Sequence, residues 1–342
     1  MKADQERRKS MRAQKIRGRL AKKILLCGVN VFLILAAGFA LAQDYPNKPI
    51  NVFVGFAPGS STGNAAHIFA EGGKKHLPNP QPIIINFKPG ASSAVAADFI
   101  LKQPPDGYNL LLLTPDLPGK LAKDGHLLSF KLDDFVPVGM IGNSPHFLAV
   151  NKEKSPFKKL EEFLDFAKKN PDKLSYGSSG IGAANYFSTY LFMLESGIKM
   201  NHVPFPGAGQ TMTALLGGHI DCFISTPATA GAQIKPGGGL RVLTFFSNKR
   251  WPELPEIPTF REKGYQLERT FWCAVAAPKG TPQNIVDILI KTLRKTAEDP
   301  QVKAALLKIG FTPSSAGAEE TLKETRKEFD VAQEIYKNLT PK

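Results

Sequence analysis

Three segments of the sequence place small polar residues directly before a predicted helix. They are Gly55–Gly63, Ser178–Asn185 and Phe205–Gln210, and each follows a short apolar run that predicts a strand. The first N–H groups of a helix have no partner inside the helix, and the helix dipole favours negative charge there. Each segment alone is compatible with an ordinary turn. Three of them on strands that converge on one cleft predict a shared site for an anion such as a carboxylate.

The first of these segments also supports an alternative. Gly59-Ser60-Ser61-Thr62-Gly63 matches G-x-S-x-G, the nucleophile elbow of serine hydrolases, with Ser61 as the nucleophile. A hydrolase needs a histidine and an acid as partners, and no histidine of the chain lies in a recognisable context. The serine also follows the first predicted strand, whereas hydrolases of that fold complete several strands first. We therefore expect a binding protein and not an enzyme.

Other kinds of site lack the residues that they need. No set of Cys and His residues has the spacing of metal ligands, and no Walker lysine or G-x-G-x-x-G accompanies the glycines. We expect no metal, no cofactor and no nucleotide.

The elements that position these segments alternate between strand and helix, which predicts an α/β fold. Several strands are almost continuously apolar, as in residues 108–114, and such runs predict parallel sheets covered on both faces. Cys222 and Cys273 are expected to be two buried thiols, with a disulfide as the alternative.

The N-terminal residues have the pattern of a secretory signal peptide. Ten Lys and Arg residues within positions 1–23 precede an uncharged apolar run from Ile24 to Ala42, which ends in the small-x-small sequence Ala40-Leu41-Ala42. We expect residues 1–42 to be cleaved and the mature chain to lie in the periplasm. An uncleaved membrane tether formed by residues 24–42 is the alternative.

Removing the signal peptide changes the charge of the protein. The whole chain carries a formal charge of +14, but residues 1–42 hold ten basic and two acidic residues, which leaves 34 basic and 28 acidic residues. A residual charge of +6 spread over the mature chain does not indicate nucleic-acid binding, which requires a concentrated basic face.

An ordered set of motifs resembles the Bug-type receptors, the substrate-binding proteins of tripartite tricarboxylate transporters. The resemblance covers residues 45–340. Its motifs are Tyr45-Pro46-Asn47-Lys48-Pro49-Ile50, Phe56-Ala57-Pro58-Gly59, Asn86-Phe87-Lys88-Pro89-Gly90-Ala91, Pro105-Asp106-Gly107-Tyr108, Lys173-Leu174-Ser175-Tyr176-Gly177-Ser178, His202-Val203-Pro204-Phe205, Leu215-Leu216-Gly217-Gly218-His219-Ile220-Asp221, Leu254-Pro255-Glu256-Ile257-Pro258-Thr259 and Ala277-Pro278-Lys279-Gly280-Thr281-Pro282.

The resemblance implies a two-lobed periplasmic binding fold, type II-like, with two crossing strands near residues 139–150 and 271–277. The first lobe would comprise residues 43–144 and 271–342, and the second residues 145–270. The ligand would lie in the cleft between them, held mainly by backbone N–H groups and hydroxyls. Its contacts would be Phe56, Pro58, Ser60, Ser61 and Thr62 in the first lobe and Ser178, Gly182, Ala183, Asn185, Phe205, Gly207, Ala208, Ser225 and Thr226 in the second.

The chain departs from the family pattern in ways that remove charge and hydroxyls from the expected cleft. These positions are Gly63, Ala183, Tyr186, Pro206 and Ser225. We therefore expect a ligand less polar than citrate, an aromatic or aliphatic monocarboxylate or dicarboxylate. The resemblance further implies a monomer that delivers this small carboxylate to a membrane permease. Delivery to a sensor is the alternative.

Overall fold

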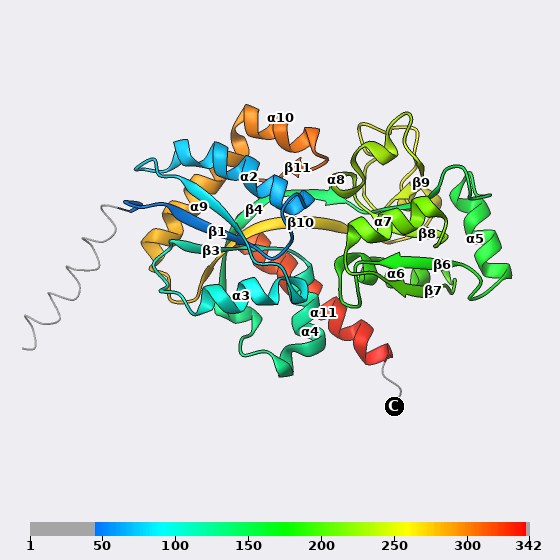
Figure 1. The fold of residues 1–342 in the computed structure, drawn as a ribbon, viewed down its shortest axis with the longest axis horizontal. Helices are drawn as coiled ribbons and strands as arrows, with labels where there is room; N and C mark the ends of the chain where they lie inside the picture. The colour runs from blue at the N-terminus through cyan, green and yellow to red at the C-terminus, as the bar shows by residue number, and fades with distance from the viewer. Residues whose placement is uncertain (1–44, 340–342) are drawn as a thin grey trace, which may run out of the picture. The chain divides into compact units, whose positions relative to one another are not determined.

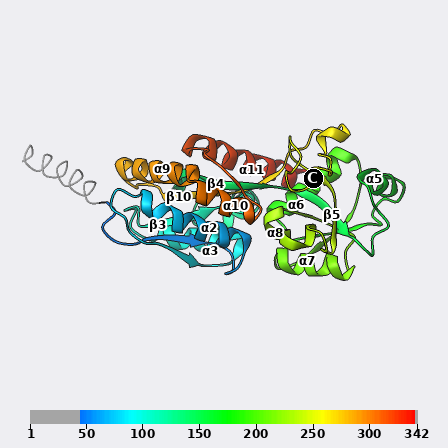
Figure 2. The ribbon, with the colours of Figure 1, turned by 90° about the horizontal axis from the view of Figure 1, so that it is seen from above.

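The computed structural model describes residues 45–339, and from Lys48 onward these residues form one compact unit. The predicted signal peptide, residues 1–42, lies outside the described residues. Within the compact unit, the strands form two separate sheets, one in each of two lobes (Figure 1 and Figure 2).

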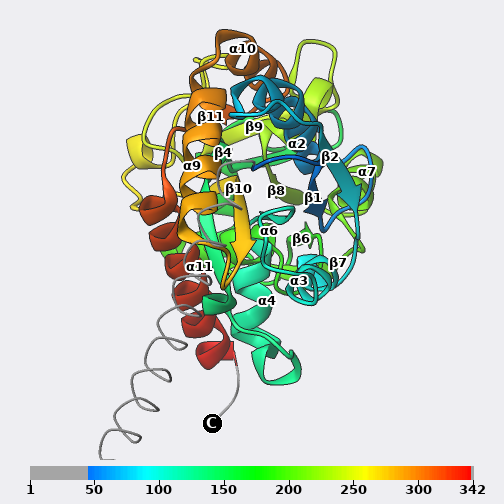
Figure 3. The same cartoon turned by 90° about the vertical axis from the view of Figure 1, so that its left-hand side faces the viewer.

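The first lobe is built on a six-stranded sheet with the order β11-β4-β10-β3-β1-β2. One face of this sheet is covered by the helices α2, α9 and α10, and the other by α3, α4 and α11 (Figure 3). The strands are β1 (Ile50–Val54), β2 (Ile83–Phe87), β3 (Asn109–Leu113), β4 (Phe135–Pro145), β10 (Thr270–Pro278) and β11 (Thr312–Pro313). The helices are α2 (Ser61–Gly73), α3 (Ala94–Leu101), α4 (Asp116–Asp124), α9 (Gln283–Glu298), α10 (Pro300–Lys308) and α11 (Ala318–Leu339).

The second lobe is built on a five-stranded sheet with the order β7-β6-β8-β5-β9. The helices α5 and α6 cover one face, and α7 and α8 cover the other. The strands are β5 (Phe147–Asn151), β6 (Ser175–Ser178), β7 (Asn201–Pro204), β8 (Cys222–Ser225) and β9 (Leu240–Phe245). The helices are α5 (Leu160–Lys169), α6 (Ala184–Ser196), α7 (Ala208–Gly217) and α8 (Pro227–Ala230).

The prediction that both sheets are parallel is wrong in part. In the first lobe β1 pairs in parallel with β2 and β3, but β10 is antiparallel to β3 and β4. In the second lobe β6 pairs in parallel with β7 and β8, but β5 is antiparallel to β8 and β9. A continuous apolar run indicates that both faces of a strand are buried. It does not indicate the direction of the neighbouring strand.

Two crossing segments join the lobes, as predicted. Only His146 separates β4 in the first sheet from β5 in the second. The return crossing runs through Arg269 into β10, slightly earlier than the predicted residue 271. Three backbone hydrogen bonds tie the crossings together: His146 N–H donates to Arg269 O at 3.0 Å, Phe246 N–H to His146 O at 2.8 Å, and Arg269 N–H to Phe246 O at 2.8 Å. The residues at which one lobe ends and the other begins stay a prediction.

Cys222 and Cys273 are free, buried thiols, which confirms the expected state. Cys222 lies in β8 of the second lobe and Cys273 lies in β10 of the first.

Candidate functional site

The loop after β1 prepares the N-terminus of α2. Ser60 is the N-cap of the helix, and its Oγ accepts a hydrogen bond from Gly63 N–H at 3.1 Å. Within the described part of the chain, the N–H groups of Ser61 and Thr62 have no hydrogen-bond partner. Phe56, Ser60 and Ser61 are half-buried, Pro58 is exposed and Thr62 is buried. The end of α2 that carries these groups is directed toward the second lobe (Figure 1).

A close approach of two loops fixes the start of this segment. A Cβ added to Gly55 would overlap Ser93 Oγ, so only glycine fits at the end of β1. Ser93 is fully buried, and its hydroxyl has no hydrogen-bond partner among residues 45–339. Gly55, the first residue of the predicted segment Gly55–Gly63, therefore allows the two loops to pack closely.

The loop after β6 is held largely by its own side chains. Ser178 is fully buried, and its Oγ accepts from Gly180 N–H at 3.2 Å and lies 2.7 Å from His202 Nε2. Asn185 Oδ1 accepts from Ser179 N–H at 3.1 Å, and its Nδ2 donates to Ser179 Oγ at 2.8 Å. Ser178 and Asn185 thus fix the shape of the loop that leads into α6. Burial lowers the pKa of His202.

The remaining second-lobe residues lie at the ends of β7 and β8. Phe205 is half-buried, and its N–H donates to Ser178 O at 2.9 Å, which joins two of the predicted segments. Gly207 is the N-cap of α7 without a side-chain cap, and Ala208 is the first residue of that helix. Ser225 is 3% exposed, and its hydroxyl has no hydrogen-bond partner in the part of the chain that the structure describes. Thr226 caps α8, because its Oγ1 accepts from Thr229 N–H at 3.2 Å.

The N-terminus of α6 receives a carboxylate from the opposite lobe. Asp116, at the start of α4, accepts a hydrogen bond on Oδ1 from Ala184 N–H at 3.0 Å and on Oδ2 from Thr114 Oγ1 at 3.1 Å. Asp116 is 6% exposed, and burial raises the pKa of its carboxyl while the two hydrogen bonds oppose that rise. Gly182 and Ala183 precede this contact, and Ala183 is buried. Asp116 was not among the predicted site residues. An acidic residue just after a buried strand is a sequence signal that could have indicated it.

A buried charged network continues from α6 to the crossing segments. Ser188 Oγ donates to Ala184 O at 2.9 Å, lies 3.0 Å from His146 Nδ1 and accepts from Arg269 Nε at 3.1 Å. Arg269 also makes a bidentate pair with Glu328 of α11, at 2.9 and 2.7 Å. Burial, followed by the nearby Arg269 charge, lowers the pKa of His146 to about 3. Residues at the junction of the lobes are therefore linked by hydrogen bonds to the helix that Asp116 contacts.

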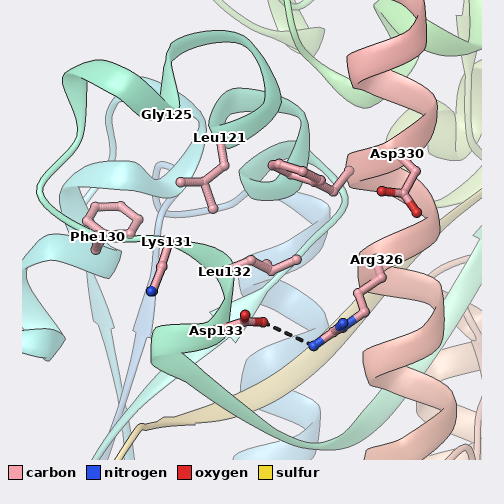
Figure 4. A pocket seen from close by; sticks show the side chains of 9 residues that line it. Leu121, Gly125, Phe130, Lys131, Leu132, Asp133, Arg326 and Asp330 are labelled. Atoms are coloured by element: carbon pink, nitrogen blue, oxygen red, sulfur yellow. Dashed lines mark hydrogen bonds and ion pairs between the residues drawn. The ribbon is translucent and has the colours of Figure 1, made fainter.

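A cavity of about 400 Å³ lies elsewhere, between α4 and α11 (Figure 4). Arg326 and Asp133 form an exposed ion pair of 3.1 Å at its edge. The cavity is lined by Leu121, Gly125, Phe130, Lys131, Leu132, Asp133, Arg326, Phe329 and Asp330, none of which is a predicted ligand contact.

Both lobes place helix N-termini at the carboxyl ends of their parallel strands. In each lobe, parallel strands end in loops that lead into helix N-termini, and ligands of open α/β sheets bind outside the carboxyl ends of the strands. Residues 65–340 match the family described as the tripartite tricarboxylate transporter family receptor. The chain belongs to this receptor family.

Individual relatives agree with the match to this receptor family. The Bordetella pertussis protein BugT is 31% identical over 87% of this chain and 91% of its own. An R. palustris protein solved with adipate is 27% identical, with a TM-score of 0.77 over 86% of this chain and 98% of that chain. MatC from Rhodopseudomonas palustris, solved with malate, is 26% identical, with a TM-score of 0.74 over 85% of this chain and 99% of that chain.

The hydrolase alternative finds no support in this receptor. Among residues 45–339, Ser61 Oγ makes no hydrogen bond with a histidine.

In the same residues, no group of three or more His, Cys, Asp or Glu side chains is placed to hold a metal ion. No helix within residues 45–339 combines the length and the apolarity that crossing a bilayer requires.

Proposed function

We propose that this receptor, once exported to the periplasm, binds a small organic acid between its lobes and delivers it to a tripartite tricarboxylate permease. The observation that carries the proposal is the free N–H pair of Ser61 and Thr62 at the end of α2 that is directed toward the second lobe. Adipate and malate, the ligands of two structural neighbours, are both small carboxylates.

Each lobe has a distinct part in the proposed binding. In the first lobe, the ligand would be held by Phe56, Pro58, Ser60, Ser61 and Thr62. In the second lobe, Phe205, Gly207, Ala208, Ser225 and Thr226 would contact the ligand, while Ser178 and Asn185 hold the loop that carries Gly182 and Ala183. Ligand contacts to both lobes stabilise the closed form, because the ligand binds that form better than the open one.

Thermal unfolding of the mature chain against a panel of small acids tests this proposal. At saturating concentrations we expect one or more carboxylates to raise the melting temperature by several degrees, since a ligand that binds only the folded state stabilises it by mass action. The alcohols of the same carbon skeletons serve as controls. A panel in which no acid shifts the transition, or in which the alcohols shift it equally, contradicts the proposal.

A further inference from the structure

We propose that Asp116 is a specificity-determining residue of the cleft, whose carboxylate takes the place of a second ligand carboxylate. The receptor then selects small acids with one carboxylate over their dicarboxylate counterparts. This inference rests on the proposed function and adds the substrate class.

The two carboxylate oxygens of Asp116 accept hydrogen bonds from different lobes. Asp116 follows β3 of the first lobe, and its Oδ2 is held in that lobe by Thr114. Its Oδ1 reaches the second lobe and accepts from Ala184 N–H, the first residue of α6. A helix N-terminus favours an anion there, and this chain supplies that anion itself. A ligand carboxylate directed at α6 would compete with Asp116 for the same donor.

Little space is left beside the contact between Asp116 and Ala184. A Cβ added to Gly119 of α4 would lie 2.9 Å from Gly182 O and 2.5 Å from Phe187 Cε2. On the other side of the loop, a Cβ on Gly182 would lie 3.1 Å from the Tyr336 hydroxyl of α11. The two lobes are therefore in van der Waals contact around the start of α6. An acid that extends to the start of α6 would therefore meet a filled surface.

The charges at the junction of the lobes also disfavour a second ligand carboxylate. Arg269 is the nearby cation of the junction, but its guanidinium already donates to both oxygens of Glu328 and to Ser188 Oγ. Arg269 and Glu328 are 4% and 5% exposed, and their charges offset each other. A second ligand carboxylate would thus approach the buried side chain of Asp116, while the guanidinium of Arg269 is already engaged by Glu328 and Ser188. Like charges at short range in a buried site repel strongly, which disfavours the diacid.

Calorimetric titration of matched acid pairs tests the inference. The pairs are butanoate with succinate, pentanoate with glutarate, and hexanoate with adipate, titrated at about pH 8, well above the ordinary pKa of a carboxylic acid in solution. For the chain length that binds, we expect the native protein to bind the monoacid at least about tenfold more tightly than the diacid. Asp116→Asn keeps an oxygen that can accept from Ala184 N–H and removes the charge. This substitution should reduce the ratio of the diacid dissociation constant to the monoacid dissociation constant at least about tenfold.

Two further variants separate the effect from general damage. Asp133→Asn makes the same chemical change at an exposed carboxylate paired with Arg326, and it should leave the ratio as in the native protein. Asp116→Ala removes both the charge and the hydrogen bond, and it should shift the ratio in the same direction as Asp116→Asn. Circular dichroism establishes that each variant is folded.

The outcomes distinguish the inference from the proposed function. If the native protein binds a diacid as tightly as its monoacid, or if folded Asp116 variants keep the native ratio, the inference is wrong while the carboxylate receptor stands. If the native protein binds no acid of either kind, the proposed function fails and the inference fails with it.

Discussion

Arg269 and Glu328 form a bidentate ion pair, with 2.9 and 2.7 Å between the paired atoms, at the junction between the two lobes. Arg269 leads into the crossing strand β10, and Glu328 belongs to α11, whose residues Ala332 and Ile335 pack into the core of the second lobe. The pair is almost completely buried. It therefore anchors the crossing strand to a helix that contacts both lobes.

Removing one partner of this pair should be costly. Glu328→Gln leaves the Arg269 charge buried without a counter-charge, and we expect the free energy of unfolding to fall by about 3–5 kcal/mol. Urea denaturation followed by circular dichroism measures the change. The double variant Arg269→Met/Glu328→Leu should recover most of the loss, because it removes both charges. A single variant as stable as the native protein would show that the pair is not essential.

His146 should make stability depend on pH in the acidic range. Its pKa in the folded protein is about 3, below the ordinary value of 6.5, so the unfolded chain binds the proton more readily. The contribution of His146 is fully present above pH 6.5 and is lost as pH falls toward 3, at up to about 1.4 kcal/mol per pH unit.

Comparison with a variant isolates this contribution. Asp116 has a raised pKa and acts in the opposite direction, but it is common to the native protein and to His146→Gln. The urea midpoint of the variant should therefore fall less steeply between about pH 6.5 and pH 4. Parallel profiles for the two proteins would assign the acid sensitivity to other groups.

Gly119 should be required for full closure of the lobes. Alanine is the better helix former, but its Cβ would lie 2.5 Å from Phe187 Cε2 and 2.9 Å from Gly182 O, both in the second lobe. Since overpacking costs about 1–3 kcal/mol, we expect Gly119→Ala to weaken acid binding about 5- to 150-fold. Gly125→Ala is the matched control, because no atom lies within 4 Å of its added Cβ. Equal dissociation constants for the two variants would mean that this contact does not limit binding.

The two cysteines should be unreactive in the folded protein. Both are buried, and burial raises the pKa of each thiol, which suppresses the reactive thiolate. An aromatic disulfide reagent should therefore modify Cys222 and Cys273 only after denaturation, and a reductant should leave the melting temperature unchanged. Rapid reaction of a native thiol, or destabilisation by the reductant, would contradict this description.

Much of the architecture followed from local sequence signals. The apolar run before Gly55 predicted β1, and the serine-rich segment after it predicted the start of α2, because strand burial and helix capping depend on neighbouring residues. The family motifs then predicted the two lobes and the crossing at residues 139–150. Strand direction could not be predicted in this way: β10 is antiparallel to β3 because the chain returns from the second lobe.

By itself, the sequence determined the receptor family, the order of strands and helices, and the loops that precede α2, α6 and α7. The tertiary structure alone decided that Asp116 meets Ala184, 68 residues away, and that Arg269 meets Glu328, 59 residues away. Neither pair has a local signature, because each depends on how two lobes close over a junction of crossing strands. The free energy of a buried charge depends on what surrounds it in space, and that environment exists only after the lobes are assembled.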